Sequence, residues 1–179
     1  MRWADIFRSL HWRKWNPKSD YGAERLLFSG RRHLKKHVWI ALAVFLADRG
    51  TKLLWDRIPA EGIVLIPGVA GLYPARNTGM AFSLFSGNPW MLGVLSAFLV
   101  AGGFLFLRKK KWSRLALTGL MMMLGGAVGN MVDRFATGFV PDMIELLFVR
   151  FAVFNIADAC LVIGCGLVIV DLLRGDKNE

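Results

Sequence analysis

Four long apolar stretches, separated by polar connections, dominate the pattern of the chain. They cover about residues 38–55, 90–107, 112–132 and 154–173. Each is close to the roughly 20 residues that a helix needs to cross a hydrocarbon core of about 30 Å. The pattern therefore predicts a mainly α membrane protein with four spanning helices.

The two longer connections carry different patterns. Residues 62–85, GIVLIPGVAGLYPARNTGMAFSLF, mix β-branched runs with glycine and proline, which predicts short strands and turns. Residues 139–151, FVPDMIELLFVRF, place Pro141 and Asp142 as a helix start with an apolar face behind them. We therefore expect a short interfacial helix in this second connection.

The first 36 residues precede any span and are basic. In MRWADIFRSLHWRKW the apolar residues recur at helical spacing, with basic residues between them. Two interpretations stay open: a helix lying on the cytoplasmic leaflet, or a basic extension without fixed structure. The chain thus divides into an extension at 1–36, a membrane domain at 37–175 and a tail at 176–179.

Composition agrees with a membrane protein, since 55% of the residues are hydrophobic. The formal net charge of +10 would suit a nucleic-acid partner, but the basic residues are distributed according to which connection or end of the chain they lie in. The two ends of the chain and the linker at 108–114 hold 17 Lys and Arg, against four in the two longer connections. The positive-inside rule then puts both termini in the cytoplasm and the longer connections outside. We expect no nucleic-acid partner.

Ionisable side chains inside a membrane are costly, so they mark candidate functional positions. Asp48 and Lys52 lie four residues apart in the first span and can pair on one helical face. Asp133 closes the third span and Asp158 opens the fourth. Because these two spans are consecutive and antiparallel, they bring two carboxylates to a similar depth on the outer side.

Two neighbouring carboxyl groups can share one proton, so that one activates water while the other polarises a scissile carbonyl. Asn130 and Asn155 each lie three residues before one of these aspartates, on the same helical face. Each aspartate also has a purely structural interpretation, Asp133 as a partner of Arg134 and Asp158 as a favourable residue at a helix start. The matched Asn and Asp pairs favour a site.

Other catalytic chemistries fit poorly. The three histidines lie on or near the cytoplasmic side, and no zinc-protease motif is present, so we expect no metal. The two cysteines lie five residues apart in the fourth span, which argues against a disulfide framework. Gly125 and Gly129 form a small-residue pair that suits close helix packing.

Two non-proteolytic functions remain open. A small ion-coupled transporter could bind a proton or cation at paired carboxylates, although no inverted repeat is visible. A membrane adaptor could use the basic extension to bind anionic lipid, although this would not explain the Asn and Asp pairs.

Four segments of the chain form a recognisable set: DRGTK at 48–52, NTGMAFSL at 77–84, GGAVGNMVDR at 125–134 and FNIADACLVIG at 154–164. Together they resemble the lipoprotein signal peptidases, the signal peptidase II family of membrane aspartic proteases. The resemblance covers about residues 40–173. Four motifs in the same order and spacing are highly specific, whereas any one alone would be weak.

The resemblance implies four transmembrane helices, a small extracytoplasmic β-cradle and an interfacial segment. It implies a site at the outer face of the bacterial inner membrane, with no cofactor. The substrates would be diacylglyceryl-modified prolipoproteins, cut on the amino side of the lipidated cysteine. The other partners would be membrane lipid and globomycin-type inhibitors.

The matched motifs also assign residues. Asp133 and Asp158 would be catalytic, with a supporting set around them: Asn77, Gly79, Asn130, Arg134, Asn155, Asp48 and Lys52. The chain departs from the family at Arg49, where glutamine is usual, and we expect this arginine to extend to the membrane surface.

Overall fold

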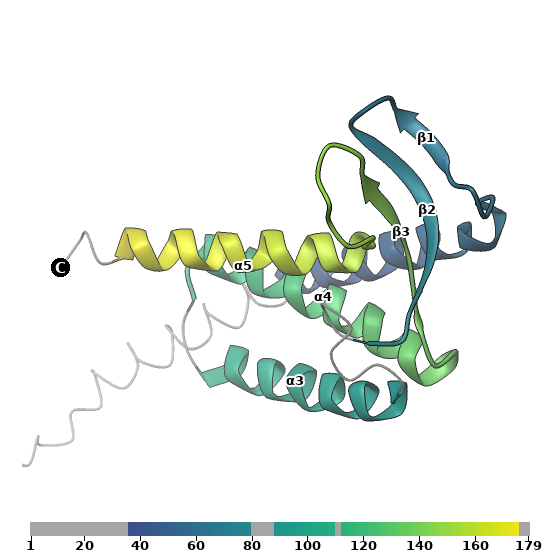
Figure 1. Cartoon of the computed structure of the whole chain (residues 1–179). Helices are drawn as coiled ribbons and strands as arrows, with labels where there is room; N and C mark the ends of the chain where they lie inside the picture. Colours follow the sequence, from purple (N-terminus) through teal and green to yellow (C-terminus); the bar gives the residue numbers. More distant parts are fainter. Residues whose placement is uncertain (1–35, 80–87, 110–111, 176–179) are drawn as a thin grey trace, which may run out of the picture.

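The computed structural model describes residues 36–79, 88–109 and 112–175 of the chain. Helices form most of it, and a small sheet lies at one end of them (Figure 1). In chain order the elements are a helix over residues 36–52, η1 (Trp55–Arg57), β1 (Ile63–Ile66), β2 (Ala70–Asn77), α3 (Pro89–Lys109), α4 (Arg114–Ala136), β3 (Val140–Leu146) and α5 (Ile156–Gly175). The basic extension before residue 36, residues 80–87, which include the MAFSL part of the NTGMAFSL segment, and the tail after residue 175 lie outside the described residues.

Three helices in the described part of the chain are long and apolar enough to cross a membrane. They are α3, α4 and α5, and each coincides with a predicted span. The helix over residues 36–52 overlaps most of the first predicted span. That this helix also crosses the membrane stays a prediction.

Small residues let α4 pack closely against its neighbours. A methyl group on Gly125 would lie 2.5 Å from the Ala41 carbonyl oxygen of the helix over residues 36–52. On Gly126 it would lie 2.5 Å from the carbonyl oxygen of Ala157 in α5. Because neither contact leaves room for a side chain, these glycines fix how near the three backbones approach. The packing role predicted for Gly125 is confirmed.

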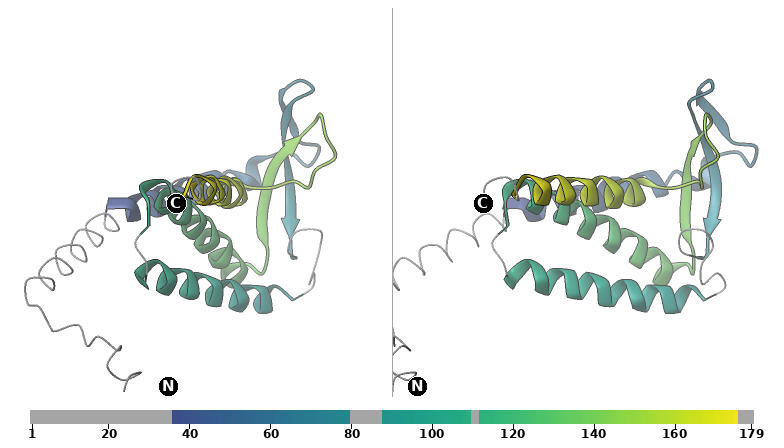
Figure 2. Two further views of the ribbon diagram at one scale, coloured as in Figure 1. Left: turned by 90° about the vertical axis from the view of Figure 1, so that its left-hand side faces the viewer. Right: turned by 60° about the vertical axis from the view of Figure 1, so that its left-hand side comes forward.

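The sheet has three antiparallel strands in the order β1-β2-β3. The strands expected within residues 62–85 are therefore confirmed as β1 and β2. A register shift between Leu72 and Ala75 bends β2 along its pairing with β3. In both views of Figure 2 the strands run across the helix axes, at the end where α4 finishes and α5 begins.

The short interfacial helix predicted from Pro141 and Asp142 is wrong, because these residues lie in strand β3. Asp142 pairs in register with Ala75, and Pro141 with Arg76. Proline has no N–H to donate, but it is tolerated on an edge strand such as β3. The pairing with β2, which lies 65 residues away in sequence, overrides the local helix-start signal.

Candidate active site

Asp158 and Asn155 cap the start of α5 reciprocally. The Asp158 N–H donates to the side-chain oxygen of Asn155 at 2.9 Å, and the Asn155 N–H donates to Asp158 Oδ2 at 3.3 Å. These bonds satisfy N–H groups that the first turn of a helix leaves unpaired. One oxygen of Asp158 therefore supports the helix, and the other is available to a different partner.

Asn130 of α4 supplies that partner. Its side-chain N–H donates to Asp158 Oδ1 at 2.7 Å, while its side-chain oxygen accepts from Lys52 Nζ at 2.9 Å and from Asn155 Nδ2 at 3.2 Å. Two donors facing the oxygen fix which way the amide points. The sequence placed Asn130 beside Asp133 on one helical face, but in the structure its amide reaches across to α5.

Asp133 lies buried between two cations. Lys52 Nζ approaches its Oδ2 at 2.6 Å, and an Arg49 terminal nitrogen approaches its Oδ1 at 2.6 Å. The carboxylate is only 4% exposed, so little water screens either pair. Both oxygens of Asp133 are thus held in ion pairs.

The predicted pairing of Asp48 with Lys52 is present, at 2.8 Å. Asp48 is fully buried and also accepts from the main-chain N–H of Ala157 at 3.2 Å. A methyl group on Gly129 would lie 2.6 Å from Asp48 Oδ2, so this glycine leaves room for the carboxylate. Asp48 therefore connects the first described helix to both α4 and α5.

The expectation that Arg49 extends to the membrane surface is wrong. Besides its ion pair with Asp133, it contacts Asp48 at 3.0 Å and donates to the Gly129 carbonyl at 3.4 Å. Two buried carboxylates and two cations are then close together, so the cluster has no net charge. A guanidinium can satisfy several acceptors at once through its fixed fork of donors, which explains its inward position.

Asp142 is the residue of this site that sequence reasoning missed. It is 2% exposed, and its two oxygens accept from Asn155 Nδ2 at 2.6 Å and from Asn77 Nδ2 at 2.9 Å. Asn155 thus contacts Asp142 with its side chain and Asp158 with its main chain. The signal was present in the sequence: a carboxylate inside the otherwise apolar stretch FVPDMI.

Burial raises the pKa of Asp142 from 3.8 to about 6. The negative charge of Asp158 acts in the same direction, whereas the hydrogen bonds from Asn77 and Asn155 and the charge of Lys52 act against it, and about 6 is the net value. Asp142 is thus a carboxyl group that takes up a proton readily, and it is electrostatically coupled to Asp158.

Arg134 and Asn77 hold the end of β2 against α4. Arg134 is buried and donates to the Gly79 carbonyl at 3.0 Å and to the Asn130 carbonyl at 3.2 Å. The Gly79 N–H donates to the Asn77 side chain at 3.0 Å. Arg134 therefore contacts main-chain carbonyls, and Lys52 and Arg49 make the ion pairs to Asp133 instead.

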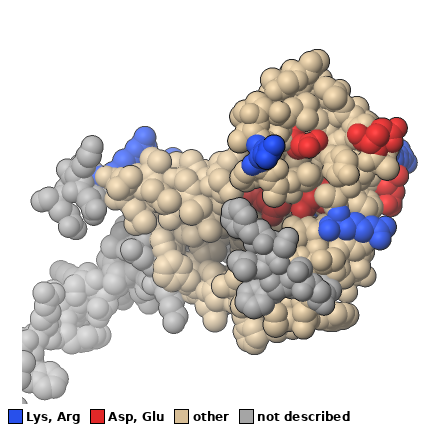
Figure 3. Space-filling model, in the orientation of Figure 1, with Lys and Arg blue, Asp and Glu red and all other residues tan. Residues whose placement is uncertain are grey.

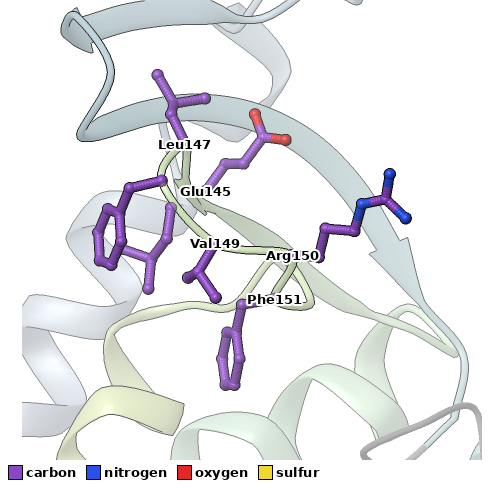
Figure 4. Close-up of a pocket in the computed structure, with 7 residues that line it drawn as sticks. Glu145, Leu147, Val149, Arg150 and Phe151 are labelled. Atoms are coloured by element: carbon purple, nitrogen blue, oxygen red, sulfur yellow. The ribbon is translucent and has the colours of Figure 1, made fainter.

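Figure 3 shows acidic side chains at the surface where the sheet meets the helices. A separate open hollow of about 610 Å³ lies under residues 145–151. There Phe151 and Val149 point toward the helices, and Arg150 points away from them (Figure 4). This hollow is lined by the end of β3 and the loop that follows it, and its lining includes none of Asp48, Asp133, Asp142 and Asp158.

Residues 40–174 match the family described as signal peptidase (SPase) II. The chain belongs to the signal peptidase II family. A lipoprotein signal peptidase of Shouchella clausii is 38% identical over 78% of this chain and 94% of the relative. One of Halalkalibacterium halodurans is 33% identical over 78% of this chain and 92% of the relative.

Solved structures agree with this membership. A bacterial membrane enzyme determined at 2.3 Å resolution superposes with a TM-score of 0.75 and 27% identity, over 81% of this chain and 92% of that one. A second, determined at 1.9 Å, gives a TM-score of 0.71 and 28% identity. The chain is therefore a signal peptidase with the fold of a membrane enzyme.

Proposed function

We propose that the chain is a membrane aspartic endopeptidase that removes signal peptides from diacylglyceryl-modified prolipoproteins, cutting on the amino side of the lipidated cysteine. One observation carries the catalytic part of this proposal. Asn155 hydrogen-bonds Asp142 and Asp158 at once, so two carboxyl groups from different elements share one partner. The curated relatives named lipoprotein signal peptidases support the substrate class.

The pair we propose is Asp142 with Asp158, in place of the Asp133 and Asp158 pair expected from sequence. An aspartic protease needs two carboxyl groups that share a proton. Asp133 is a poor candidate, because a cation lies 2.6 Å from each of its oxygens and both oxygens are already held in ion pairs. Asp142 is a better one, because its hydrogen-bond partners are neutral amides and its pKa is raised to about 6.

In the proposed reaction one carboxyl of the pair is ionised and the other is protonated. The ionised carboxylate takes a proton from water, whose oxygen attacks the scissile carbonyl carbon, while the protonated carboxyl donates its proton to the carbonyl oxygen. The tetrahedral intermediate then expels the amino group of the cysteine, which receives a proton from the pair. Asn130 and Asn155 hold Asp158 throughout, and Asn77 and Asn155 hold Asp142.

The surrounding residues would keep this pair in place. Asp133, Asp48, Lys52 and Arg49 form the neutral ion cluster beneath it, and Lys52 fixes the amide of Asn130 that donates to Asp158. Arg134 would hold Gly79 through its main-chain carbonyl.

We further propose four spanning helices, with both termini in the cytoplasm and the site at the outer face of the bacterial inner membrane. The excess of Lys and Arg at the two ends and in the linker supports this orientation. A substrate held by its own signal helix and acyl chains would then enter from the lipid, since each buried CH₂ contributes about 0.8 kcal/mol. Globomycin-type peptides would bind at the same site.

The test is cleavage of a diacylglyceryl-modified prolipoprotein by the purified full chain. Asp142→Asn and Asp158→Asn should each lower kcat by at least about 100-fold, the usual scale for loss of an acid or base. Asp56→Asn, at an exposed position of η1, is the matched control and should cleave normally. Full activity of Asp142→Asn would refute the proposed pair, and equal cleavage of substrate with and without the diacylglyceryl group would refute the substrate class.

A further inference from the structure

Trp55 lies directly behind the proposed catalytic Asp142. It stands in η1, immediately after the helix that carries Asp48 and Lys52, and is 9% exposed. Its indole N–H donates to the main-chain carbonyl oxygen of Asp142 at 2.9 Å. The indole therefore contacts the peptide of Asp142, while Asn77 and Asn155 contact its carboxyl group.

The position of β3 in the sheet makes this bond important. β3 is an edge strand, and β2 is its neighbour on one side only. On the other side the bridge to Phe154 reaches Met143 and Ile144, which follow Asp142. An edge strand is less restrained than a central one, so an additional donor at residue 142 restrains the strand where the carboxyl must be placed.

Aromatic contacts fix the orientation of the indole. The Trp55 and Phe139 rings lie with centroids 5.8 Å apart at an interplanar angle of 50°. The guanidinium of Arg76 lies 5.5 Å from the Trp55 ring centroid and 4.9 Å from that of Phe139. The contact between the two rings and the contacts of the cation with each ring are all attractive, and together they direct the indole N–H at Asp142.

We propose that Trp55 is a positioning residue for catalysis, whose indole N–H holds the Asp142 peptide so that the carboxyl faces Asp158. This inference rests on the proposed function, since it requires Asp142 to be one of the catalytic pair. In this proposal Trp55 acts only through Asp142 and does not contact the substrate. Its removal should therefore change turnover and leave substrate binding intact.

The decisive variant is Trp55→Phe, which keeps an aromatic ring between Phe139 and Arg76 but removes the N–H donor. Purified full-length protein in detergent micelles should cleave the lipidated prolipoprotein with kcat lowered by about tenfold, and KM should change by less than about twofold. The pH profile of kcat should also shift, because a displaced Asp142 has a different coupling to Asp158. Trp90→Phe, at an exposed tryptophan of α3, is the matched control and should match the wild type in both respects.

The possible outcomes separate the two proposals. If Asp142→Asn is inactive and Trp55→Phe keeps the wild-type kcat and pH profile, the role of Trp55 is refuted and the catalytic pair stands. If Asp142→Asn is fully active, the pair itself is refuted, whatever Trp55→Phe does. A rise in KM alone in Trp55→Phe would indicate substrate contact and would also refute the positioning role.

Thermal unfolding and size-exclusion chromatography show whether each variant is folded. If Trp55→Phe does not fold, Arg76→Gln decides the question. Arg76 is exposed, and this variant keeps the indole but removes the cation that lies over both rings. It should lower kcat by about threefold at unchanged KM, since a cation–π contact at an exposed site is worth about 0.5–1 kcal/mol. Wild-type turnover of Arg76→Gln would then refute the proposal.

Discussion

The side-chain amide of Asn155 donates to the carboxylate of Asp142 at 2.6 Å, 13 residues earlier in the chain. The main-chain N–H of the same residue donates to Asp158. One asparagine thereby contacts the carboxyl group of a strand residue and that of a helix residue. The following predictions test this arrangement and the cluster of ion pairs beneath it.

Replacing Asn155 by alanine should separate the effects on activity and on stability. The variant loses the bonds to Asp142 and Asn130 and the cap of α5. We expect kcat to fall by about 100-fold, because misplacing a reacting group by about 1 Å costs this much. Stability should fall by about 2–4 kcal/mol, because the cap is lost and the buried oxygens of Asp142 and Asn130 each lose a donor. Prolipoprotein cleavage and thermal unfolding measure the two effects. If cleavage activity falls only in proportion to the fraction of folded protein, the role of Asn155 in catalysis is contradicted.

Lys52 and Arg49 should differ in importance, although both pair with Asp133. Lys52→Met leaves Asp48 and Asp133 buried with one cation fewer and should destabilise the protein by about 3–5 kcal/mol. Arg49→Gln removes a cation that is 27% exposed, so water can partly replace it, but its partners Asp48 and Asp133 are buried; it should cost about 1–2 kcal/mol, less than Lys52→Met. Thermal unfolding in detergent ranks the two variants. A larger loss for Arg49→Gln would mean that the arginine is the main counter-ion of the cluster.

Stability should depend on pH through Asp142. Its pKa is about 6 in the folded chain and 3.8 as the ordinary value, so the folded state binds the extra proton between these two values. The raised pKa of Asp142 therefore contributes about 3 kcal/mol to the free energy of unfolding at low pH. This contribution is fully present below pH 3.8 and is lost as the pH rises through about 6. We expect Asp142→Asn to remove this part of the dependence. Unfolding of both proteins between pH 4 and 7 measures it, and parallel curves would contradict the assignment.

The contact of α4 with α5 should tolerate no side chain at Gly126. Gly126→Ala places a methyl group 2.5 Å from the Ala157 carbonyl and should destabilise the protein by about 1–3 kcal/mol. Activity should fall as well, since Ala157 adjoins Asp158. Gly102→Ala in α3 is the matched control, because no atom outside its own helix lies within 4 Å of the added carbon. The control should match or slightly exceed wild-type stability in a melting experiment.

The sequence indicated much of this protein correctly. Apolar runs of spanning length mark α3, α4 and α5, because the length of an apolar run is a local property. The mixture of the β-branched run IVLI with nearby glycine and proline residues marks the region of β1 and β2 in the same way. The pairing of Asp48 with Lys52 was also local, since residues four apart share a helical face.

Only the tertiary structure decided which residues of distant segments contact one another. Residues 139–151 carry a helix-start signal, yet β3 forms because β2 offers it a hydrogen-bonded partner 65 residues away. The sequence predicts Asp133 and Asp158 at a similar depth on consecutive spans. In the structure, however, Lys52 and Arg49, about 80 residues before Asp133, occupy both of its oxygens. Asp142 joins Asp158 through Asn155 because a strand and a helix meet there. Hydrogen bonds and ion pairs depend on positions within a few ångströms, and only the packing of distant segments sets those positions.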